Sequence, residues 1–552
     1  MHSRCIGPPM ETRFKPDLKV RFLCHDWRTG GALVAALIFL VLSTILYGLS
    51  WNHVSAGFLS DDAVYLLMAD GFSPFSHADP RLSAYVMRET LFPPLYPLLL
   101  ALLGAGSESL LWAHLVTTTT LVLSLSIYAV WVNSELQDRG AAIGLATIFA
   151  LAPGTLLQNM ELLSEFPYLM LTLVALWLAE RPQSKGRSHT VVALCVGLAT
   201  VTRTAGLSLL VAFGIWLLRR RIPDRAKLVA VALMPSSIWF CYKKWVLISK
   251  GGYSTFWSSL WEKSQSTQGF VASFLEHQGK GLWDALLNIM DLRPTHLTQV
   301  MLGVTLLAAV PTWIRRLWLW RLDAWYLLVG GAMILLYPFP GFFSRLFLPW
   351  VPIVLFYAYL GVLGITARWS EIRGRPAFAY VYLAGLFLTL VPTLGFISHR
   401  FAEPIDPELA SWKHTRYWFR FQDMTKIRED VRFRQDLIRA TQGVAPQVPE
   451  GECVFGVYTA ISMLYGHRIF LQPPSPAVTD SEFERLGQAC NYFWLVAAPG
   501  TVGERRVEAF YPKERLSPDR IEMVESWKGA REAEAPTAVL LRAKPRAGLD
   551  AR

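Results

Sequence analysis

The sequence predicts an all-α polytopic membrane bundle with a small C-terminal α/β domain on the extracytoplasmic side. Of the 552 residues, 53% are hydrophobic and only 17% are charged, with a mean hydropathy of +0.32. Soluble proteins of this length have roughly a quarter charged residues. Apolar runs of about twenty residues, the length that a membrane helix needs, recur along the chain. Basic residues gather in the short segments between these runs, which is the pattern of the positive-inside rule.

The net charge of +11 therefore reflects membrane topology, and we exclude nucleic acid as a partner. Five basic residues within positions 13–28 precede the first apolar run, which is longer than the core of a signal peptide. This pattern predicts a signal anchor in the plasma (inner) membrane. Residues 1–29 would then form a cytoplasmic N-terminal segment.

Charge placement predicts about eleven crossings within residues 30–400, with the N-terminus inside and the C-terminus outside. The run 190–218 has basic residues at both ends, so the rule favours two short helices with an outer tip near Arg203. Residues 51–90 would form an outer loop, and residues 92–103 a short interfacial helix. The other expected spans are 31–50, 109–132, 141–158, 167–179, 227–247, 297–314, 322–338, 346–367 and 377–397.

The character of the chain changes near residue 401, which predicts a separate domain over residues 401–552. Apolar residues at helical spacing within Trp412–Gln442 indicate an amphipathic helix on the membrane or on the bundle. Short stretches that alternate in strand-like and helix-like patterns follow, which predicts an α/β fold. The expected elements are strands at 453–457, 468–471 and 492–497 and helices at 459–465 and 480–489. Outside the cell, Cys453 and Cys490 could pair, although their spacing does not fix their distance.

Several ionisable residues fall at the predicted outer ends of the helices: Asp61, Asp62, Arg81, Arg88, Glu161, Glu165, Arg203 and Arg345. Each has an ordinary explanation as an interfacial anchor or a solvated loop residue, and Asp61 and Asp62 could simply cap a helix. Arg203 is the exception, because an arginine within a long apolar stretch is costly unless it is paired or functional. Together they place acids opposite bases at a lipid–water boundary.

Such an arrangement suits one class of reaction. A carboxylate can take a proton from a hydroxyl acceptor as a general base. Arginines can hold a phosphate and neutralise the charge that it gains as a leaving group. This chemistry fits sugar transfer from a polyprenyl phosphate whose tail stays in the bilayer.

Five short motifs resemble, in order, the GT-C glycosyltransferases. Within these enzymes the motifs most resemble the protein mannosyltransferase type (glycosyltransferase family 39-like), which includes bacterial aminoarabinose transferases and the rhizobial RgtA/B/C/D-like lipopolysaccharide glycosyltransferases. The motifs are Ser60–Tyr65, Pro93–Pro97, Ser164–Tyr168, Thr202–Gly206 and Ser344–Pro349. The resemblance covers about residues 30–400. It implies an integral-membrane, inverting hexosyl- or pentosyltransferase that uses a polyprenyl-phosphate sugar and a lipid, glycan or protein hydroxyl on the extracytoplasmic face.

The resemblance also implies roles for individual residues. The catalytic base would be Asp61 or Asp62, and Glu165 would orient the acceptor or a metal. The family often has a basic residue before its Pro-Pro pair, where this chain has Phe92. Contact with the donor phosphate would then fall to other arginines, namely Arg81, Arg88, Arg203 and Arg345. The resemblance leaves a divalent metal open, with Asp62 and Glu165 as its ligands if one is used.

Two other classes of function compete with the enzyme. A transporter or lipid-linked glycan flippase tends to carry charges near the midplane and broken helices in repeated halves. The predicted spans here are nearly free of charge and show no internal repeat. A non-catalytic membrane protein whose outer domain binds a partner is the third interpretation.

Overall fold

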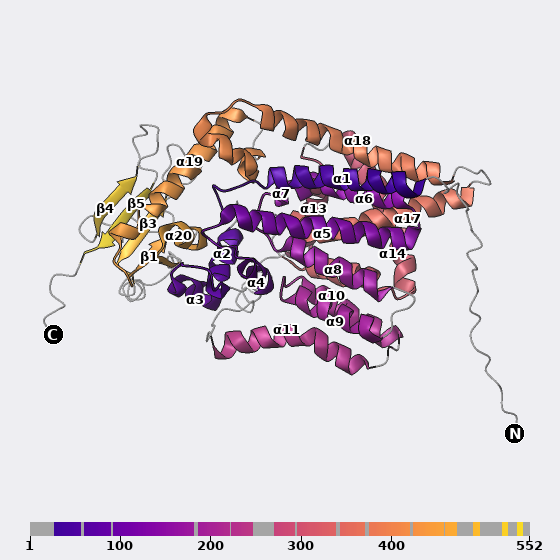
Figure 1. Ribbon diagram of the computed structural model, residues 1–552, viewed down its shortest axis with the longest axis horizontal. Helices are drawn as coiled ribbons and strands as arrows, with labels where there is room; N and C mark the ends of the chain where they lie inside the picture. The colour runs from indigo at the N-terminus through magenta and orange to yellow at the C-terminus, as the bar shows by residue number, and fades with distance from the viewer. Residues whose placement is uncertain are drawn as a thin grey trace, which may run out of the picture.

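The structure, a computed structural model, is a bundle of roughly aligned helices with a small sheet at one end, which we call the sheet end (Figure 1). It describes residues 27–56, 60–89, 92–180, 186–220, 222, 224–246, 270–292, 295–337, 343–369, 375–419, 423–456, 459–471, 490–496, 521–527 and 538–544. The predicted helix 480–489 lies outside the described residues.

Each of the predicted spans overlaps a helix of the bundle. These helices are α1 (Trp27–Leu49), α5 (Leu110–Leu136), α6 (Arg139–Leu151), α8 (Glu165–Ala179), α9 (Gly186–Thr200), α10 (Gly206–Arg220), α11 (Arg225–Trp245), α14 (His296–Trp318), α15 (Leu322–Leu335), α17 (Val351–Trp369) and α18 (Arg375–Ala402). Large aromatic side chains fill the core between them. The ring of Trp131 in α5, for example, lies 5.0 Å from that of Phe356 in α17.

The chain is an integral membrane protein. Among the described residues, five helices are long and apolar enough to cross a membrane, and four shorter helices are also apolar. The predicted helical fold with a small C-terminal sheet is therefore confirmed. The count of about eleven crossings and the direction of the termini stay predictions.

The predicted break near Arg203 is confirmed. Helix α9 ends at Thr200 and α10 begins at Gly206. The backbone folds back tightly here, because a Cβ on Gly206 would lie 2.4 Å from the carbonyl oxygen of Ala199. Arg203 thus lies at the tip of a helical hairpin, where it is available for pairing.

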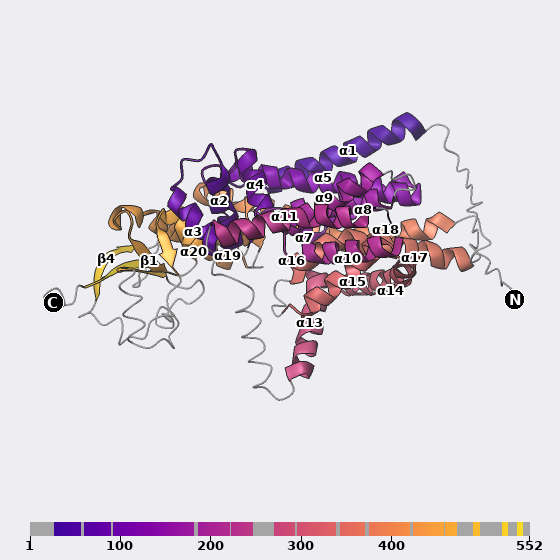
Figure 2. The same ribbon diagram turned by 90° about the horizontal axis from the view of Figure 1, so that it is seen from below.

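Short helices gather at the sheet end between the bundle and the sheet. They include α2 (Ser60–Phe72), α3 (Pro80–Glu89), α4 (Leu95–Leu102), α7 (Pro153–Gln158) and α16 (Phe343–Phe347), which runs through η2 (Leu348–Trp350) into α17. The predicted interfacial helix corresponds to α4. Helix α13 (Phe270–Met290) leaves the bundle at a steep angle (Figure 2).

The C-terminal region forms a mixed five-stranded sheet of order β2-β1-β3-β5-β4. Its elements are β1 (Cys453–Gly456), α20 (Thr459–Gly466), β2 (Ile469–Leu471), β3 (Tyr492–Val496), β4 (Ile521–Trp527) and β5 (Ala538–Ala543). Strand β1 runs parallel to β2 and β3, whereas β5 runs antiparallel to β3 and β4. A disulfide joins Cys453 to Cys490, so that pairing is confirmed. Strands β4 and β5 were not predicted.

The predicted helix over Trp412–Gln442 is wrong in its first part. Residues Pro407–His414 and Arg416–Phe419 form the 3-10 helices η3 and η4. Among the described residues of the predicted range, only Met424–Gln442 forms an α-helix, α19. Asp423 caps α19 by accepting a hydrogen bond from the backbone of Thr425. A short 3-10 turn, η5 (Ala445–Gln447), follows. The buried aromatic side chains of Trp412, Tyr417 and Trp418 hold the 3-10 segment against the bundle.

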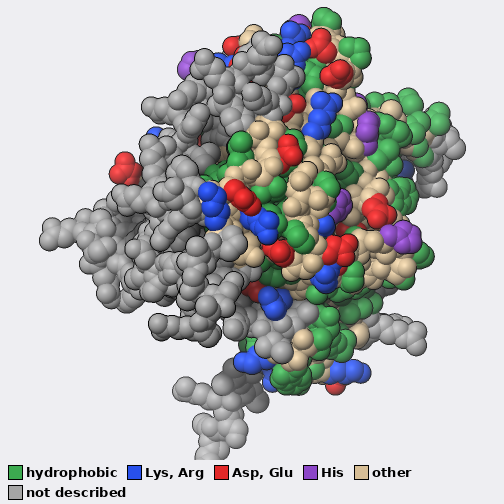
Figure 3. All heavy atoms as spheres, turned by 90° about the vertical axis from the view of Figure 1, so that its left-hand side faces the viewer, with side chains coloured by type: hydrophobic (Ala, Val, Ile, Leu, Met, Phe, Trp, Pro, Cys, Tyr) green, Lys and Arg blue, Asp and Glu red, His purple; other side chains and the backbone are tan. Residues whose placement is uncertain are grey.

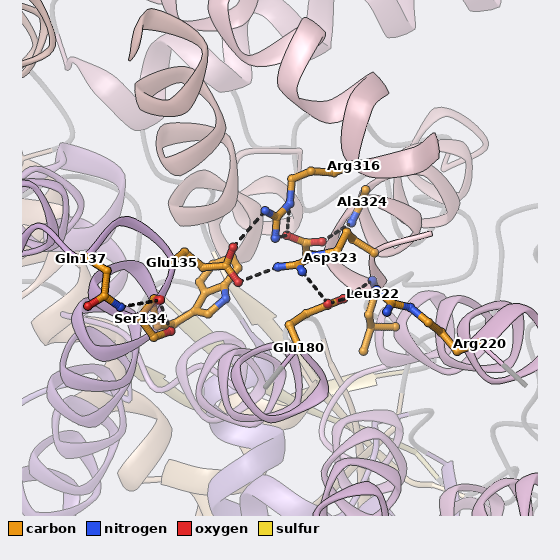
Figure 4. A network of polar contacts seen from close by, with 11 residues as sticks. Ser134, Glu135, Gln137, Glu180, Arg220, Arg316, Leu322, Asp323 and Ala324 are labelled. Atoms are coloured by element: carbon orange, nitrogen blue, oxygen red, sulfur yellow. Dashed lines mark hydrogen bonds and ion pairs between the residues drawn. The ribbon is translucent and has the colours of Figure 1, made fainter. Parts of the chain in front are cut away.

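At the end of the bundle away from the sheet end, a network of ion pairs that we did not predict joins several helices (Figure 4). Arg316 donates from Nε to Asp323 at 2.8 Å and from Nη1 to Glu135 at 3.2 Å. Arg321 contacts Glu135 at 2.6 Å and Glu180 at 2.9 Å. These contacts tie the ends of α5, α8, α14 and α15 together. Arg220 also contacts Glu180, at 3.5 Å, so three acids face three arginines.

Replacing Asp323 with Asn should lower thermal stability. Asp323 is fully buried, and its loss leaves the Arg316 guanidinium with less compensating charge. Breaking a buried pair from one side typically costs about 3–5 kcal/mol. The measurement is thermal unfolding of the purified protein in detergent. The control is Arg220→Gln, which removes a half-exposed partner of Glu180 and should change little. Equal effects of the two variants would contradict the prediction.

Candidate active site

The first turn of α2 places two carboxylates in different surroundings. Acidic residues are favourable in this turn because the N-terminus of a helix is electropositive, and both Asp61 and Asp62 lie there. The Asp61 side chain keeps 23% of its surface exposed. Asp62 is completely buried. Of the two carboxylates, only Asp61 is accessible from outside the protein.

Four of the predicted residues meet in one cluster, which we call the arginine cluster: Asp61, Glu165, Arg203 and Arg345. Arg345 donates from Nη1 to Asp61 Oδ2 at 2.9 Å and from Nε to Glu165 Oε1 at 2.8 Å. Arg203 Nη1 lies 2.5 Å from the same Glu165 oxygen. Glu165 is completely buried, so a single buried carboxylate holds both arginines.

The cluster is assembled from four separate elements at the sheet end. Asp61 begins α2, Glu165 begins α8, Arg203 lies between α9 and α10, and Arg345 belongs to α16. Hydrogen bonds lock these elements together. The hydroxyls of Tyr65 and Ser164 are 2.9 Å apart, which joins α2 to the start of α8. The backbone N–H of Leu95 donates to Val201 at 2.8 Å, which joins α4 to the hairpin.

Asp62 lies beside the cluster and faces a different partner. Its Oδ2 accepts the backbone N–H of Leu162 at 3.1 Å, and its Oδ1 has no hydrogen-bond partner among the described residues. Burial raises the pKa of Asp62 well above its ordinary value, and the charges of Glu161 and Asp61 add to this rise. Burial thus favours the protonated form of Asp62, which supports the turn before α8 through its bond to Leu162.

The raised pKa of Asp62 predicts a pH-dependent stability. The folded protein keeps this proton at pH values where the unfolded chain, with an ordinary value of 3.8, has lost it. The contribution of Asp62 to stability therefore falls as pH rises from that value through the folded pKa. Asp62→Asn should abolish this component. Unfolding temperatures of wild type and Asp62→Asn against pH test it, and parallel curves would refute it.

Arg81 and Arg88 are not brought into the arginine cluster. Arg81 pairs with Asp79 at 2.8 Å, and Arg88 contacts Glu89 at 2.9 Å; both arginines lie on α3 with about half of their side chains exposed. A role for them in binding phosphate stays a prediction. Arg203 and Arg345, by contrast, lie side by side on Glu165.

Sequence reasoning missed one contributor, Arg416 in η4. Its Nη1 donates to Glu161 Oε1 at 3.0 Å, and Glu161 is completely buried near Asp62. The signal in the sequence was a basic residue among aromatic ones just beyond the last apolar run. The C-terminal region also contacts the loop before α2, where the Ala56 N–H donates to the Tyr465 hydroxyl at 2.8 Å. On the surface of the sheet end, acidic and basic side chains lie among one another (Figure 3).

The site does not fit a metal held by protein side chains. Among the described residues, no group of three or more His, Cys, Asp or Glu side chains is placed to hold a metal ion. The proposed ligand Glu165 is already occupied by two guanidinium groups, whose charge would repel a cation. We therefore derive no chemical step through a metal.

Comparisons with known proteins give a likeness to solved structures only. No family model and no curated protein matches the chain. One similar structure is the archaeal oligosaccharyltransferase AglB from Archaeoglobus fulgidus in complex with an inhibitory peptide and a dolichol-phosphate. It is 14% identical, with 84% of this chain and 69% of that chain covered and a TM-score of 0.48.

A second similar protein is ArnT from Cupriavidus metallidurans. Its apo structure is 12% identical, with 94% of this chain and 99% of that chain covered and a TM-score of 0.48. Its complex with undecaprenyl phosphate is also 12% identical, with coverages of 94% and 100% and a TM-score of 0.45.

Proposed function

We propose that this protein is an integral-membrane, inverting glycosyltransferase. It moves a sugar from a polyprenyl-phosphate donor to a hydroxyl of a lipid, glycan or protein on the extracytoplasmic face. In this proposal the arginine cluster faces that side of the membrane together with the C-terminal domain, residues 401–552, and the N-terminus is cytoplasmic.

One observation carries the proposal: a partly exposed carboxylate touches one of two arginines that share a buried glutamate, at the end of a membrane bundle. Two guanidinium groups side by side suit a phosphate, which they can bind through several hydrogen bonds. A lipid tail would lie along the apolar helices while its headgroup reaches this end. The carboxylate of Asp61 would then reach an acceptor hydroxyl on the face of the sugar opposite the phosphate.

The reaction uses few protein groups. The acceptor oxygen attacks the anomeric carbon as the bond from that carbon to the phosphate oxygen breaks, and the electron pair leaves with the phosphate. Asp61 takes the hydroxyl proton, as a general base. Arg345 and Arg203 offset the charge that develops on the phosphate. Attack from the face opposite the leaving group inverts the anomeric configuration.

The other two acids have supporting roles in this mechanism. Glu165 positions the two arginines, because its Oε1 accepts from both and its side chain is fully buried. Asp62 supports the turn between α7 and α8 through its bond to the Leu162 N–H. Neither side chain is open to an acceptor hydroxyl.

The test is an assay in proteoliposomes with a panel of radiolabelled polyprenyl-phosphate sugars and lipid, glycan and peptide acceptors. Formation of labelled product together with free polyprenyl phosphate is the expected result. Movement of labelled donor across the bilayer without any transfer would overturn the proposal. The protein would then be a flippase, and the arginine cluster would be part of its gate.

A further inference from the structure

The free protein holds its candidate base in an ion pair with its candidate phosphate ligand. Arg345 Nη1 contacts Asp61 Oδ2 at 2.9 Å. The same guanidinium cannot keep this contact and give all of its donors to an incoming phosphate. The inference rests on the proposed function. When a donor phosphate binds, one of the two acids, Asp61 or Glu165, must give up its contact with Arg345.

Of the two acids that contact Arg345, Asp61 is held less firmly than Glu165. Glu165 is completely buried and accepts from both arginines, so its displacement would leave a buried charge without compensation. Asp61 is joined to Arg345 through one contact, and 23% of its side chain is exposed. Its position in the first turn of α2 also stabilises its charge without help from an arginine.

Exchange of the Asp61 carboxylate for a donor phosphate on Arg345 would preserve the charge balance of the arginine cluster. Asp61 and Glu165 balance Arg203 and Arg345 in the free protein. A polyprenyl-phosphate sugar is a phosphodiester with one negative charge, so it can replace the Asp61 carboxylate on Arg345 without leaving an uncompensated ion. Paired guanidinium and phosphate groups form strong, charge-assisted hydrogen bonds.

We propose that Arg345 is a latch on Asp61, which the donor phosphate opens by taking the place of the Asp61 carboxylate on the guanidinium. The base is released only when a leaving group is in place. While Arg345 keeps its contact with Glu165, its Nη1 thus has two partners in turn, Asp61 in the free protein and phosphate in the complex. The acceptor hydroxyl then loses its proton to the freed Asp61, as in the mechanism above, and donor binding precedes that step.

The latch predicts that a variant with an impaired base binds phosphate more tightly. Undecaprenyl phosphate, without a sugar, is titrated into the full-length protein in nanodiscs. Asp61→Asn should bind about fivefold more tightly or better than wild type, because Arg345 no longer has a charged competitor. Asp406→Asn is the matched control, since it removes an exposed carboxylate paired with Arg432, away from the cluster, and should not change the affinity.

A double variant separates the latch from simple charge repulsion. In the Arg345→Gln background, adding Asp61→Asn should not raise the affinity for undecaprenyl phosphate, because the guanidinium for which the Asp61 carboxylate and the phosphate compete is gone. An equal gain in both backgrounds, or no gain in Asp61→Asn alone, would overturn the latch but leave the proposed function standing. Absence of undecaprenyl phosphate binding by wild type would instead overturn the proposed function, and the latch with it.

A second measurement needs no substitution at Arg345. A water-soluble carbodiimide with an added amine labels accessible carboxylates, and peptide mass spectrometry measures the extent. Undecaprenyl phosphate should raise labelling of Asp61 in wild type, with Asp406 as the unchanged internal reference. Unchanged or lower labelling of Asp61 would contradict the latch.

Discussion

Asp61→Asn should lower the rate of sugar transfer about a hundredfold or more, the usual scale for removing a general base. Asparagine has the same shape and can still accept the hydrogen bond from Arg345, so the arginine cluster should keep its geometry. What it lacks is the capacity to take a proton. Initial rates of transfer in proteoliposomes, at saturating donor, measure this effect on kcat.

Asp62→Asn is the matched control for this assignment. Asp62 is buried and its pKa is raised, so the neutral asparagine side chain resembles its protonated form and can still accept from Leu162. We expect a much smaller loss of rate. A larger loss in Asp62→Asn than in Asp61→Asn would show that the assignment is reversed.

The helical fold could be predicted because its signals are local. Apolar runs mark the helices, and the two basic ends of the run 190–218 indicated the hairpin that the structure shows at Arg203. Strand β4 lacks such a signal. Strand β4 carries Glu522 and Glu525 among its apolar residues, so its sequence gives no clear period.

The sequence indicates where the candidate site residues lie when topology alone decides their location, and their roles stay predictions. The sequence placed Asp61, Glu165, Arg203 and Arg345 at one end of the bundle, and the structure joins them. It could not tell which arginine pairs with which acid, because that depends on how distant helices pack.

Local pairing explains why two other arginines lie apart from the cluster. Asp79, two residues before Arg81, forms an ion pair with it, and Glu89 does the same for its neighbour Arg88. An acid this close in the sequence pairs with its neighbouring arginine more readily than do the acids of the distant arginine cluster.

The second large effect concerns Glu165→Gln, which should reduce both stability and transfer. The substitution removes the one charge that holds Arg203 and Arg345 together in a buried place. The loss of one partner from such a group typically costs about 3–5 kcal/mol. With the arginines no longer positioned, the rate of transfer should also fall. Thermal unfolding in detergent and transfer in proteoliposomes measure the two effects.

Phosphate binding distinguishes this role of Glu165 from a merely structural one. An anion that binds both arginines would replace the lost carboxylate, so undecaprenyl phosphate should raise the unfolding temperature of Glu165→Gln more than that of wild type. Glu180→Gln is the matched control, because Glu180 is also buried and also pairs with two arginines, Arg220 and Arg321, at the other end of the bundle. Undecaprenyl phosphate should not restore its stability. If both variants respond alike to the lipid phosphate, Glu165 supports the fold without positioning the arginines for a donor.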